Sequence, residues 1–384
     1  MVFIAGPRQV GKTTVGRSLK GLASHFAYIN WDSQDDRNLI IQGPNKVAER
    51  VNLEKARRGK LLIVFDEIHK YKKWKQFLKG FFDVYGEECQ IVVMGSAKLN
   101  VYKAGGDSLM GRYFLYRIHP FSVGELLRTR SSEKEIQSPK KVAQKDFEAL
   151  LRFGGFPEPY LKRNPRFSVN WQRLRREQLF REDIRDLSQV QELAQLEMLA
   201  TLLTDQTGQL LSYNNLANVI NVSAPTIKRW LSSLESFYYA FRIHPWTKNV
   251  KRTLKKDPKY YLCDWSLVQD EGARHENFVA SHLLKAVHLW TDSGLGEYNL
   301  HFVRDKEKRE VDFLVTKNHT PFFLVEVKTT SHSGISRSLH YFHKQLKVPH
   351  AFQVVFDTPY IQKDCFSYRK PVIVPITTFL SQLV

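Results

Sequence analysis

The residues best suited to chemistry form a glycine-rich segment near the start of the chain. After the apolar run Met1–Ala5, residues 6–14 read GPRQVGKTT, which contains the pattern G-x-x-x-x-G-K-T. In this pattern the backbone N–H groups of the loop surround a β-phosphate, the lysine reaches the β- and γ-phosphate oxygens, and the threonine hydroxyl ligates Mg²⁺. The segment therefore predicts a site for ATP and Mg²⁺, with Lys12 as a catalytic residue and Thr13 as a metal ligand. The predicted nucleotide-binding residues are Gly6, Pro7, Arg8, Gln9, Val10, Gly11, Lys12, Thr13 and Thr14.

An acidic pair supplies the second part of this predicted site. Residues 60–67 read KLLIVFDE, a continuous apolar run that ends in Asp66 and Glu67, as expected of a buried parallel strand. Asp66 is expected to hold Mg²⁺ through water, and Glu67 to orient and deprotonate the attacking water. Taken alone, an acidic pair at a strand end is more often a solvated turn. Its place downstream of the glycine-rich segment favours the catalytic interpretation.

The elements around these motifs indicate a single α/β sheet. Tyr28–Asp32 and Gln90–Ala97 read as further strands, and Tyr71–Val84 reads as an amphipathic helix. Strands that alternate with helices are typical of a doubly wound sheet, which binds its ligand at the carboxyl ends of the strands.

A second group of chemically capable residues lies in the last third of the chain. Glu276 falls on an amphipathic helix, Asp312 in the strand EVDFLV, and Glu326 with Lys328 in the strand FFLVEVK. Side chains alternate along a strand, so Glu326 and Lys328 share one face. We expect Asp312 and Glu326 to hold Mg²⁺, Lys328 to position or activate water against a phosphodiester, and Glu276 to bind a second metal or orient water. Charged strand ends are common, so the pattern equally fits a domain that binds without cleaving.

The middle of the chain carries a helix-turn-helix pattern. Residues 211–231 give one helix, a tight turn and a second helix that begins at Ser223. In a DNA-binding module the second helix enters the major groove, and the basic stretch 248–259 would follow the phosphate backbone. The alternatives are a packing or dimerisation module and a solvated linker. The residues predicted to contact nucleic acid are Thr226, Lys228 and Arg229.

The composition restricts the class of protein. The 384 residues suffice for two or three domains, and no apolar run reaches the roughly 18 residues of a membrane helix. The cysteines lie too far apart for a thiolate zinc cluster, and no export signal is visible at the first residues. We therefore expect a cytoplasmic protein without membrane contact. The formal charge of +19 favours a polyanion, and nucleic acid, DNA in particular, is the expected partner.

Several of these segments together resemble a known family. GPRQVGKTT, YINWD, LLIVFDEIHK and VVMGSAKL, followed by Gly111-Arg112 and IHPFSVGEL, resemble a large prokaryotic group of AAA+ ATPases whose C-terminal domains look like PD-(D/E)XK nucleases. The resemblance extends over essentially the whole chain. It implies that Ser96 is the sensor 1 residue and that Arg112 is an arginine finger for a neighbouring subunit of a homo-oligomer. Members usually carry a segment before the first strand that helps to cover the adenine, so the sequence predicts a shortened N-terminus.

The expected architecture is α/β throughout. It comprises a P-loop AAA+ ATPase core with a doubly wound sheet (1–130), a helical lid (146–204), a winged helix (205–255) and a PD-(D/E)XK nuclease-like domain (256–384). The expected function is ATP hydrolysis with Mg²⁺, coupled to a C-terminal domain that binds and cleaves nucleic acid. Two alternatives stay open: a nucleotide-switched DNA-binding or regulatory protein with an inactive nuclease-like domain, and an ATPase that acts on protein partners.

Overall fold

The computed structural model describes residues 1–53, 61–95, 109–129, 133–184, 192–247, 257–332 and 334–384. The chain divides into two compact units. The first comprises Met1–His119 with Ser236–Tyr238, and the second comprises Pro120–Glu235 with Tyr239–Val384. Within these residues, no helix is long and apolar enough to span a membrane.

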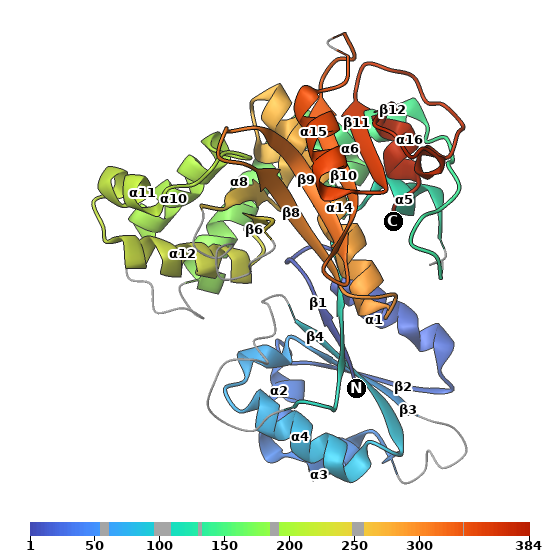
Figure 1. Cartoon of the computed structure of the whole chain (residues 1–384). Coiled ribbons are helices and arrows are strands. Elements are labelled where there is room, and N and C mark those ends of the chain that lie inside the picture. The colour runs from blue at the N-terminus through green and yellow to red at the C-terminus, as the bar shows by residue number, and fades with distance from the viewer. Residues whose placement is uncertain (54–60, 96–108, 130–132, 185–191, 248–256, 333) are drawn as a thin grey trace. The chain divides into compact units, whose positions relative to one another are not determined.

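The first unit alternates strands and helices, as the sequence predicts (Figure 1). Its strands are β1 (Val2–Ala5), β2 (His25–Asn30), β3 (Leu61–Asp66), β4 (Cys89–Gly95) and β5 (Phe114–Arg117). Its helices are α1 (Lys12–Ser18), η1 (Leu19–Leu22), α2 (Gln34–Gln42), α3 (Pro44–Arg50), η3 (Ile68–Lys70) and α4 (Trp74–Tyr85). The described strands form one sheet in the order β2-β3-β4-β1-β5, and every pairing in it is parallel.

Both faces of this sheet are covered, which explains the unbroken apolar run of β3. On one face, Phe3 and Phe65 pack with the apolar side of α4, including Phe77 and Phe81. On the other, α1 crosses β4 so closely that a Cβ on Gly16 would lie 2.3 Å from Cε of Met94. The doubly wound α/β fold is therefore confirmed for this unit.

The second unit begins with a largely helical part and continues into a sheet. Its helices are α5 (Val123–Leu127), α6 (Gln144–Phe153), α7 (Pro157–Lys162), α8 (Pro165–Gln178), η4 (a π-helical segment, Leu179–Ile184), α10 (Leu193–Asp205), α11 (Tyr213–Ile220), α12 (Ala224–Ser236), η5 (Trp265–Leu267), α14 (Glu271–Asp292), α15 (Arg337–Leu346), η6 (Cys365–Ser367) and α16 (Ile376–Ser381). Its strands are β6 (Ala240–Pro245), β7 (Lys259–Leu262), β8 (Tyr298–Arg304), β9 (Glu310–Lys317), β10 (Thr320–Lys328), β11 (His350–Val355) and β12 (Val372–Pro375).

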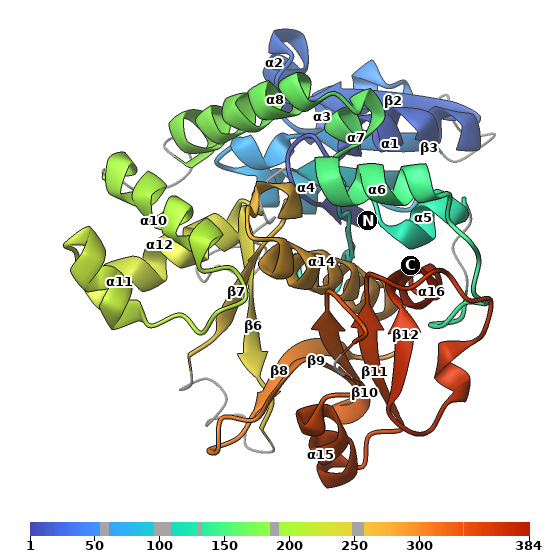
Figure 2. The ribbon, with the colours of Figure 1, turned by 90° about the horizontal axis from the view of Figure 1, so that it is seen from above.

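These strands form a mixed sheet in the order β12-β11-β10-β9-β8-β6-β7. The pairs β8–β9 and β9–β10 are antiparallel, whereas β10–β11 and β11–β12 are parallel. Figure 2 shows α14 across one face of the sheet and α15 on the other. Phe278 of α14 belongs to one core with Phe313 of β9, and Phe342 of α15 belongs to another with Leu314. The alternation of strand side chains thus places neighbouring residues of β9 in different cores.

The helices expected to form a lid pack on the C-terminal sheet unit. Phe147 and Leu150 of α6 belong to the same core as Phe278, and the indole Nε1 of Trp265 donates to the Leu150 carbonyl at 3.0 Å. α5 also belongs here: a Cβ on Gly124 would lie 2.1 Å from the carbonyl carbon of Val384. The boundary between the compact units therefore falls before α5, at His119, whereas the sequence predicts that the ATPase core extends to residue 130.

The helix-turn-helix elements are present as α11 and α12. The Ser223 hydroxyl accepts from the Thr226 N–H at 3.3 Å, and Asn221 takes a left-handed conformation at the turn (φ 60°). The strands that follow, β6 and β7, are antiparallel, but β6 also pairs with β8 and so belongs to the large sheet. The winged-helix assignment stays a prediction.

Candidate functional sites

The glycine-rich segment forms a tight loop between β1 and α1. Gln9 and Gly11 take left-handed conformations, with φ of 63° and 103°. Gly11 lies directly before α1, and a residue with a Cβ would be strained there. A Cβ on Gly6 would lie 2.4 Å from the Ile118 carbonyl oxygen, so the loop starts where only glycine fits. The backbone conformation of the loop thus requires glycine at positions 6 and 11, as in phosphate-binding loops.

Lys12 places its ammonium group under this loop. The side chain is buried (6% exposed), and Nζ donates to the carbonyl oxygens of Gly6 at 3.1 Å and Pro7 at 2.7 Å. Burial of an ammonium group is costly unless hydrogen bonds compensate for lost water. The fold therefore holds the Lys12 ammonium group against the loop that the sequence predicts to bind phosphates.

Asp66 lies opposite Thr13 at the end of β3. The Thr13 hydroxyl donates to Oδ2 of Asp66 at 3.1 Å, and the Tyr28 hydroxyl donates to the same oxygen. The other oxygen, Oδ1, is buried without a hydrogen-bond partner among the described residues. Burial, with the neighbouring charge of Glu67, raises the pKa of Asp66. A buried carboxylate oxygen left without a partner, beside a hydroxyl, fits a divalent cation that prefers oxygen ligands.

Glu67 follows in a strained turn, with φ of 54°. Its N–H donates to the Met94 carbonyl at 3.0 Å, which fixes the turn to β4. Its carboxylate Oε2 lies 3.5 Å from Nζ of Lys70 and 3.8 Å from Nε2 of His69. Burial lowers the pKa of His69, so its imidazole is neutral near pH 7. The Glu67 side chain is 17% exposed.

Sequence reasoning missed the residues that surround this acidic pair. Tyr28 sits on β2, whose register pairs it with Val64, and Lys70 joins Glu67 to Asp32 with Nζ–Oδ2 at 2.7 Å. β2 ends at Asn30, before the predicted Asp32, and the Trp31 N–H donates to the Asp66 carbonyl at 3.0 Å. Tyr28 and Asp32 both belong to the motif YINWD, but their contacts with Asp66 and Lys70 can be identified only from the pairing of β2 with β3.

Two further predicted residues of this unit have different outcomes. Ser96 lies outside the described residues. Arg112 forms an ion pair with Asp83 of α4, with Nε–Oδ1 at 2.8 Å and Nη2–Oδ2 at 3.3 Å. Its guanidinium is thus engaged within its own chain, and its role toward a neighbouring subunit stays a prediction.

The C-terminal carboxylates come together as the sequence predicts. Glu276 projects from α14, Asp312 from β9 and Glu326 from β10. Oδ2 of Asp312 accepts from the Val327 N–H at 2.8 Å, which locks the carboxylate against the neighbouring strand. Burial and the charges of Glu276 and Glu326 raise the pKa of Asp312. This cluster, Glu276, Glu310, Asp312 and Glu326, is called the carboxylate cluster below.

Lys259 supplies the cation of the carboxylate cluster. Its side chain is 4% exposed, and Nζ lies 2.7 Å from Oε1 of Glu310 and 3.3 Å from Oε1 of Glu276. Burial acts to lower the pKa of Lys259, but Glu276, Asp312 and Glu310 raise it overall. The sequence interpretation of Lys259 as part of an exposed basic stretch is therefore wrong. The reason is that Lys259 is the first residue of β7, whose pairing with β6 draws it into the sheet.

The carboxylate cluster does not fit a metal ion as it is arranged. Among the described residues, no group of three or more His, Cys, Asp or Glu side chains has the geometry to hold one. Nζ of Lys328 lies 2.9 Å from Oε1 of Glu326, so a second ammonium neutralises the cluster. Oε2 of Glu326 is nevertheless buried without a hydrogen-bond partner in the described part of the chain. The metal-binding role of Glu276, Asp312 and Glu326 stays a prediction.

The predicted nucleic-acid residues lie on α12 as expected of an amphipathic helix. Lys228 and Arg229 are exposed, whereas Ile227 and Trp230 are buried. The Thr226 hydroxyl lies 2.9 Å from the Ser223 hydroxyl, and Nζ of Lys228 lies 5.2 Å from the centre of the Tyr213 ring. Contact of Thr226, Lys228 and Arg229 with nucleic acid stays a prediction.

Comparison with known proteins separates the chain into three matched regions. Residues 1–127 match a family model described as AAA domain. Residues 144–271 and 271–378 match the models of two domains of unknown function, DUF8612 and DUF4143.

Similar proteins occur in bacteria. An uncharacterized protein of Mycobacterium tuberculosis is 24% identical over 354 residues, which is 88% of this chain and 72% of that protein. An uncharacterized protein of Haemophilus influenzae is 23% identical over 311 residues, covering 73% of this chain and 74% of that protein. The solved structure of C. elegans PCH-2 is similar at 15% identity and a TM-score of 0.25, over 60% of this chain and 61% of that one. The match to the AAA domain coincides with the loop, Lys12 and Asp66, so the first 127 residues are similar to a nucleotide-binding domain of AAA-type ATPases.

Proposed function

We propose that the first unit hydrolyses ATP with Mg²⁺. The observation that carries the proposal is the meeting of Thr13 and Asp66 at 3.1 Å, with the unpartnered Oδ1 of Asp66 and the buried ammonium of Lys12 beside the loop. Thr13 and Asp66 would hold Mg²⁺, which supplies neutralisation of charge on the β- and γ-phosphates. Lys12 would exchange its two loop carbonyls for phosphate oxygens.

Glu67 is the proposed acceptor of the proton from the attacking water. Its Oε2 lies 3.5 Å from Nζ of Lys70 and 3.8 Å from Nε2 of His69. Lys70 also binds Asp32, so the side chain of Lys70 is held in place and orients Glu67 in turn. A positioned base of this kind typically accelerates a reaction about 10²- to 10⁴-fold.

The test measures nucleotide binding and turnover separately. Glu67→Gln should bind ATP as wild type does and lose about 10²-fold or more in turnover. Lys12→Ala should lose binding and turnover together, while Lys20→Ala, which removes an exposed lysine just beyond α1, should change neither. Turnover that persists in Lys12→Ala would show that the hydrolysis takes place elsewhere.

Nucleic acid is the proposed partner of the second unit. The formal charge of +19 and the exposure of Lys228 and Arg229 on α12 support this proposal. Replacing both by Gln should weaken DNA binding and reduce the slope of log K against log salt by about 0.9 for each lost phosphate contact. Replacing Lys162 and Arg166, exposed residues on and near α7 and α8, by Gln serves as the control of equal charge. ATP turnover that rises with a protein substrate and not with DNA would favour the protein-directed alternative.

Arg112 is the proposed link between subunits of a homo-oligomer. To reach a neighbouring nucleotide it must leave Asp83, so Asp83→Asn and Arg112→Ala should have opposite effects. We expect Arg112→Ala to abolish the rise of specific turnover with protein concentration, and Asp83→Asn to preserve or strengthen it. Specific turnover independent of concentration in the wild type would refute the role.

Metal-dependent cleavage of nucleic acid is a second candidate function. The buried, unpartnered Oε2 of Glu326 favours it, while Lys259 in the carboxylate cluster opposes it. Incubation of the protein with DNA or RNA and Mg²⁺ or Mn²⁺ decides the matter. Cleavage that disappears in Asp312→Ala would support the candidate, and intact substrate under both metals would leave a binding domain without nuclease activity.

A further inference from the structure

Tyr28 contacts the candidate ATP site from β2, the strand beside β3. Its hydroxyl donates to Oδ2 of Asp66, and the Thr13 hydroxyl donates to the same oxygen at 3.1 Å. Oδ1 of Asp66 is buried without a hydrogen-bond partner among the described residues. The two hydroxyl groups thus hold one oxygen of the carboxylate and leave the other to a bound ion.

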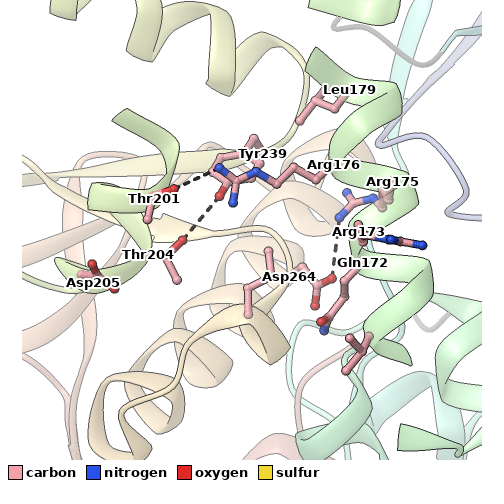
Figure 3. Close-up of a pocket in the computed structure, with 12 residues that line it drawn as sticks. Gln172, Arg173, Arg175, Arg176, Leu179, Thr201, Thr204, Asp205, Tyr239 and Asp264 are labelled. Atoms are coloured by element: carbon pink, nitrogen blue, oxygen red, sulfur yellow. Dashed lines mark hydrogen bonds and ion pairs between the residues drawn. The ribbon is translucent and has the colours of Figure 1, made fainter. Parts of the chain in front are cut away.

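Asp264 of the second unit is a contrasting case, a buried aspartate with a partner at each oxygen. Figure 3 shows it beside Arg175 in the wall of a cavity of about 330 Å³, and its Oδ2 lies 3.6 Å from Nη1 of Arg175. Its Oδ1 accepts from the N–H of Ser266 at 3.2 Å and from the hydroxyl of Ser266 at 2.5 Å. A carboxylate satisfied in this way stabilises the fold. Asp66 differs because both hydroxyl groups donate to a single oxygen.

The ring of Tyr28 is fixed by α1, the helix that follows the glycine-rich loop. This helix passes so close that a Cβ on Gly16 would lie 3.3 Å from Cε2 of Tyr28, and the guanidinium carbon of Arg17 lies 5.6 Å from the centre of the ring. The register of β2 with β3 pairs Tyr28 with Val64, two residues before Asp66. Strand pairing and helix packing together therefore set the position of the Tyr28 hydroxyl.

A carboxylate held by a single hydrogen bond is poorly oriented, because the Cβ–Cγ torsion of aspartate has a broad energy minimum. We propose that Tyr28 is a positioning residue that fixes the rotation of the Asp66 carboxylate and thereby raises the affinity of the ATP site for Mg²⁺. Groups that hydrogen-bond to metal ligands typically contribute a factor of about 10 to 100 in metal affinity. The inference rests on the proposed function, because Asp66 is the proposed ligand of Mg²⁺ in ATP hydrolysis.

Tyr28→Phe in the full-length protein tests this role, because it removes the hydroxyl and keeps the ring. Binding of Mn²⁺ in the presence of saturating ADP, followed by electron paramagnetic resonance, should weaken about 10- to 100-fold. Affinity for ADP in the presence of a chelator should stay unchanged, because Lys12 and the loop are intact.

ATP turnover supplies a second measurement on the same variant. The Mg²⁺ concentration for half-maximal turnover should rise by a similar factor, and saturating Mg²⁺ should restore turnover. Tyr85→Phe is the control, because it removes a hydroxyl of the same unit that donates to Oδ1 of Asn45 at 3.1 Å. We expect Tyr85→Phe to bind Mn²⁺ as the wild type does.

Equal Mn²⁺ affinity in Tyr28→Phe and the wild type would overturn the inference, as would an equal loss in Tyr85→Phe. A merely structural role would lower turnover at every Mg²⁺ concentration, so turnover that saturating Mg²⁺ does not restore also counts against positioning. The proposed function fails separately: a wild type that binds Mn²⁺ with ADP and does not hydrolyse ATP refutes hydrolysis but leaves the comparison of Mn²⁺ affinities intact. A wild type that does not bind Mn²⁺ with ADP overturns both.

Discussion

Replacing Lys259 by Met should destabilise the second unit, because it removes a buried cation from a group of half-buried carboxylates. Methionine keeps most of the side-chain volume, so the change isolates the charge. Removing one partner of a buried ion pair typically costs about 3–5 kcal/mol, since the other partner is left buried and uncompensated. The structure indicates the lower end of this range.

The reason lies in the hydrogen bonds that the two carboxylates keep. Oε1 of Glu276 still accepts from the Tyr261 hydroxyl at 2.6 Å, and Oε2 of Glu310 still pairs with Nη1 of Arg304 at 2.6 Å. We therefore expect a loss of about 3 kcal/mol, which corresponds to about a hundredfold loss of hydrogen-exchange protection. Replacing Glu276 by Gln in the same protein should recover part of that loss, because it removes one uncompensated charge.

The assay is native-state hydrogen exchange, read on the amide groups of β9 and β10. Exchange resolves local stability, whereas a single unfolding midpoint of a chain with two compact units does not. Lys306→Met is the control, because Lys306 is exposed and its loss changes the net charge equally. Unchanged protection in Lys259→Met, or an equal loss in Lys306→Met, would refute the role of Lys259 as the cation of the carboxylate cluster.

Three further predictions concern other charged groups. Millimolar Mn²⁺ should restore part of the lost hydrogen-exchange protection of β9 and β10 in Lys259→Met and leave the wild type unchanged, because the freed carboxylates gain affinity for a dication. Burial raises the pKa of Asp66, so without metal the folded state of the first unit loses stability as the pH rises above the pKa that Asp66 has in the unfolded chain. Asp66→Asn should therefore stabilise the first unit against urea at pH 7 in the presence of a chelator. The same change should abolish Mg²⁺-dependent turnover. Burial lowers the pKa of His282 to about 3, so the unfolded state alone takes up this proton below pH ~6.5, and about 2 kcal/mol should be lost between pH 7 and pH 5. Pulse proteolysis at both pH values should show a smaller loss for His282→Gln.

The sequence predicts the first unit well because its signals are local. The loop needs glycine at positions where the backbone conformation admits little else, and β3 is apolar up to Asp66 because both faces of the sheet are covered. The geometry of Thr13 and Asp66 then follows from the parallel order of β1 and β3 around β4. Tyr28 was missed because its hydroxyl matters only through the pairing of β2 with β3, and pairing partners leave little trace in a single sequence.

The second unit was predicted less well because its decisive contacts join distant segments. Asp312, Glu326 and Lys328 were found from strand alternation, but nothing local to Lys259 distinguishes it from the basic residues before it. The same holds for α5, whose Val123 N–H donates to Nε2 of His282 at 3.1 Å, 159 residues away. A charged residue next to a run of like charges is normally solvated, and only the register of β6 with β7 overrides that expectation.

The buried lysines also change what the net charge of +19 implies. Lys12, Lys259 and Lys285 are all buried, and Lys259 and Lys285 are paired with carboxylates inside the second unit. A buried, paired charge contributes little to the field at a distance, because its partner cancels it at close range. The formal charge therefore does not locate a nucleic-acid surface. The proposed contacts are the exposed residues Lys228 and Arg229, and the salt dependence of their double variant therefore tests the proposed partner more directly than any overall measure of basicity.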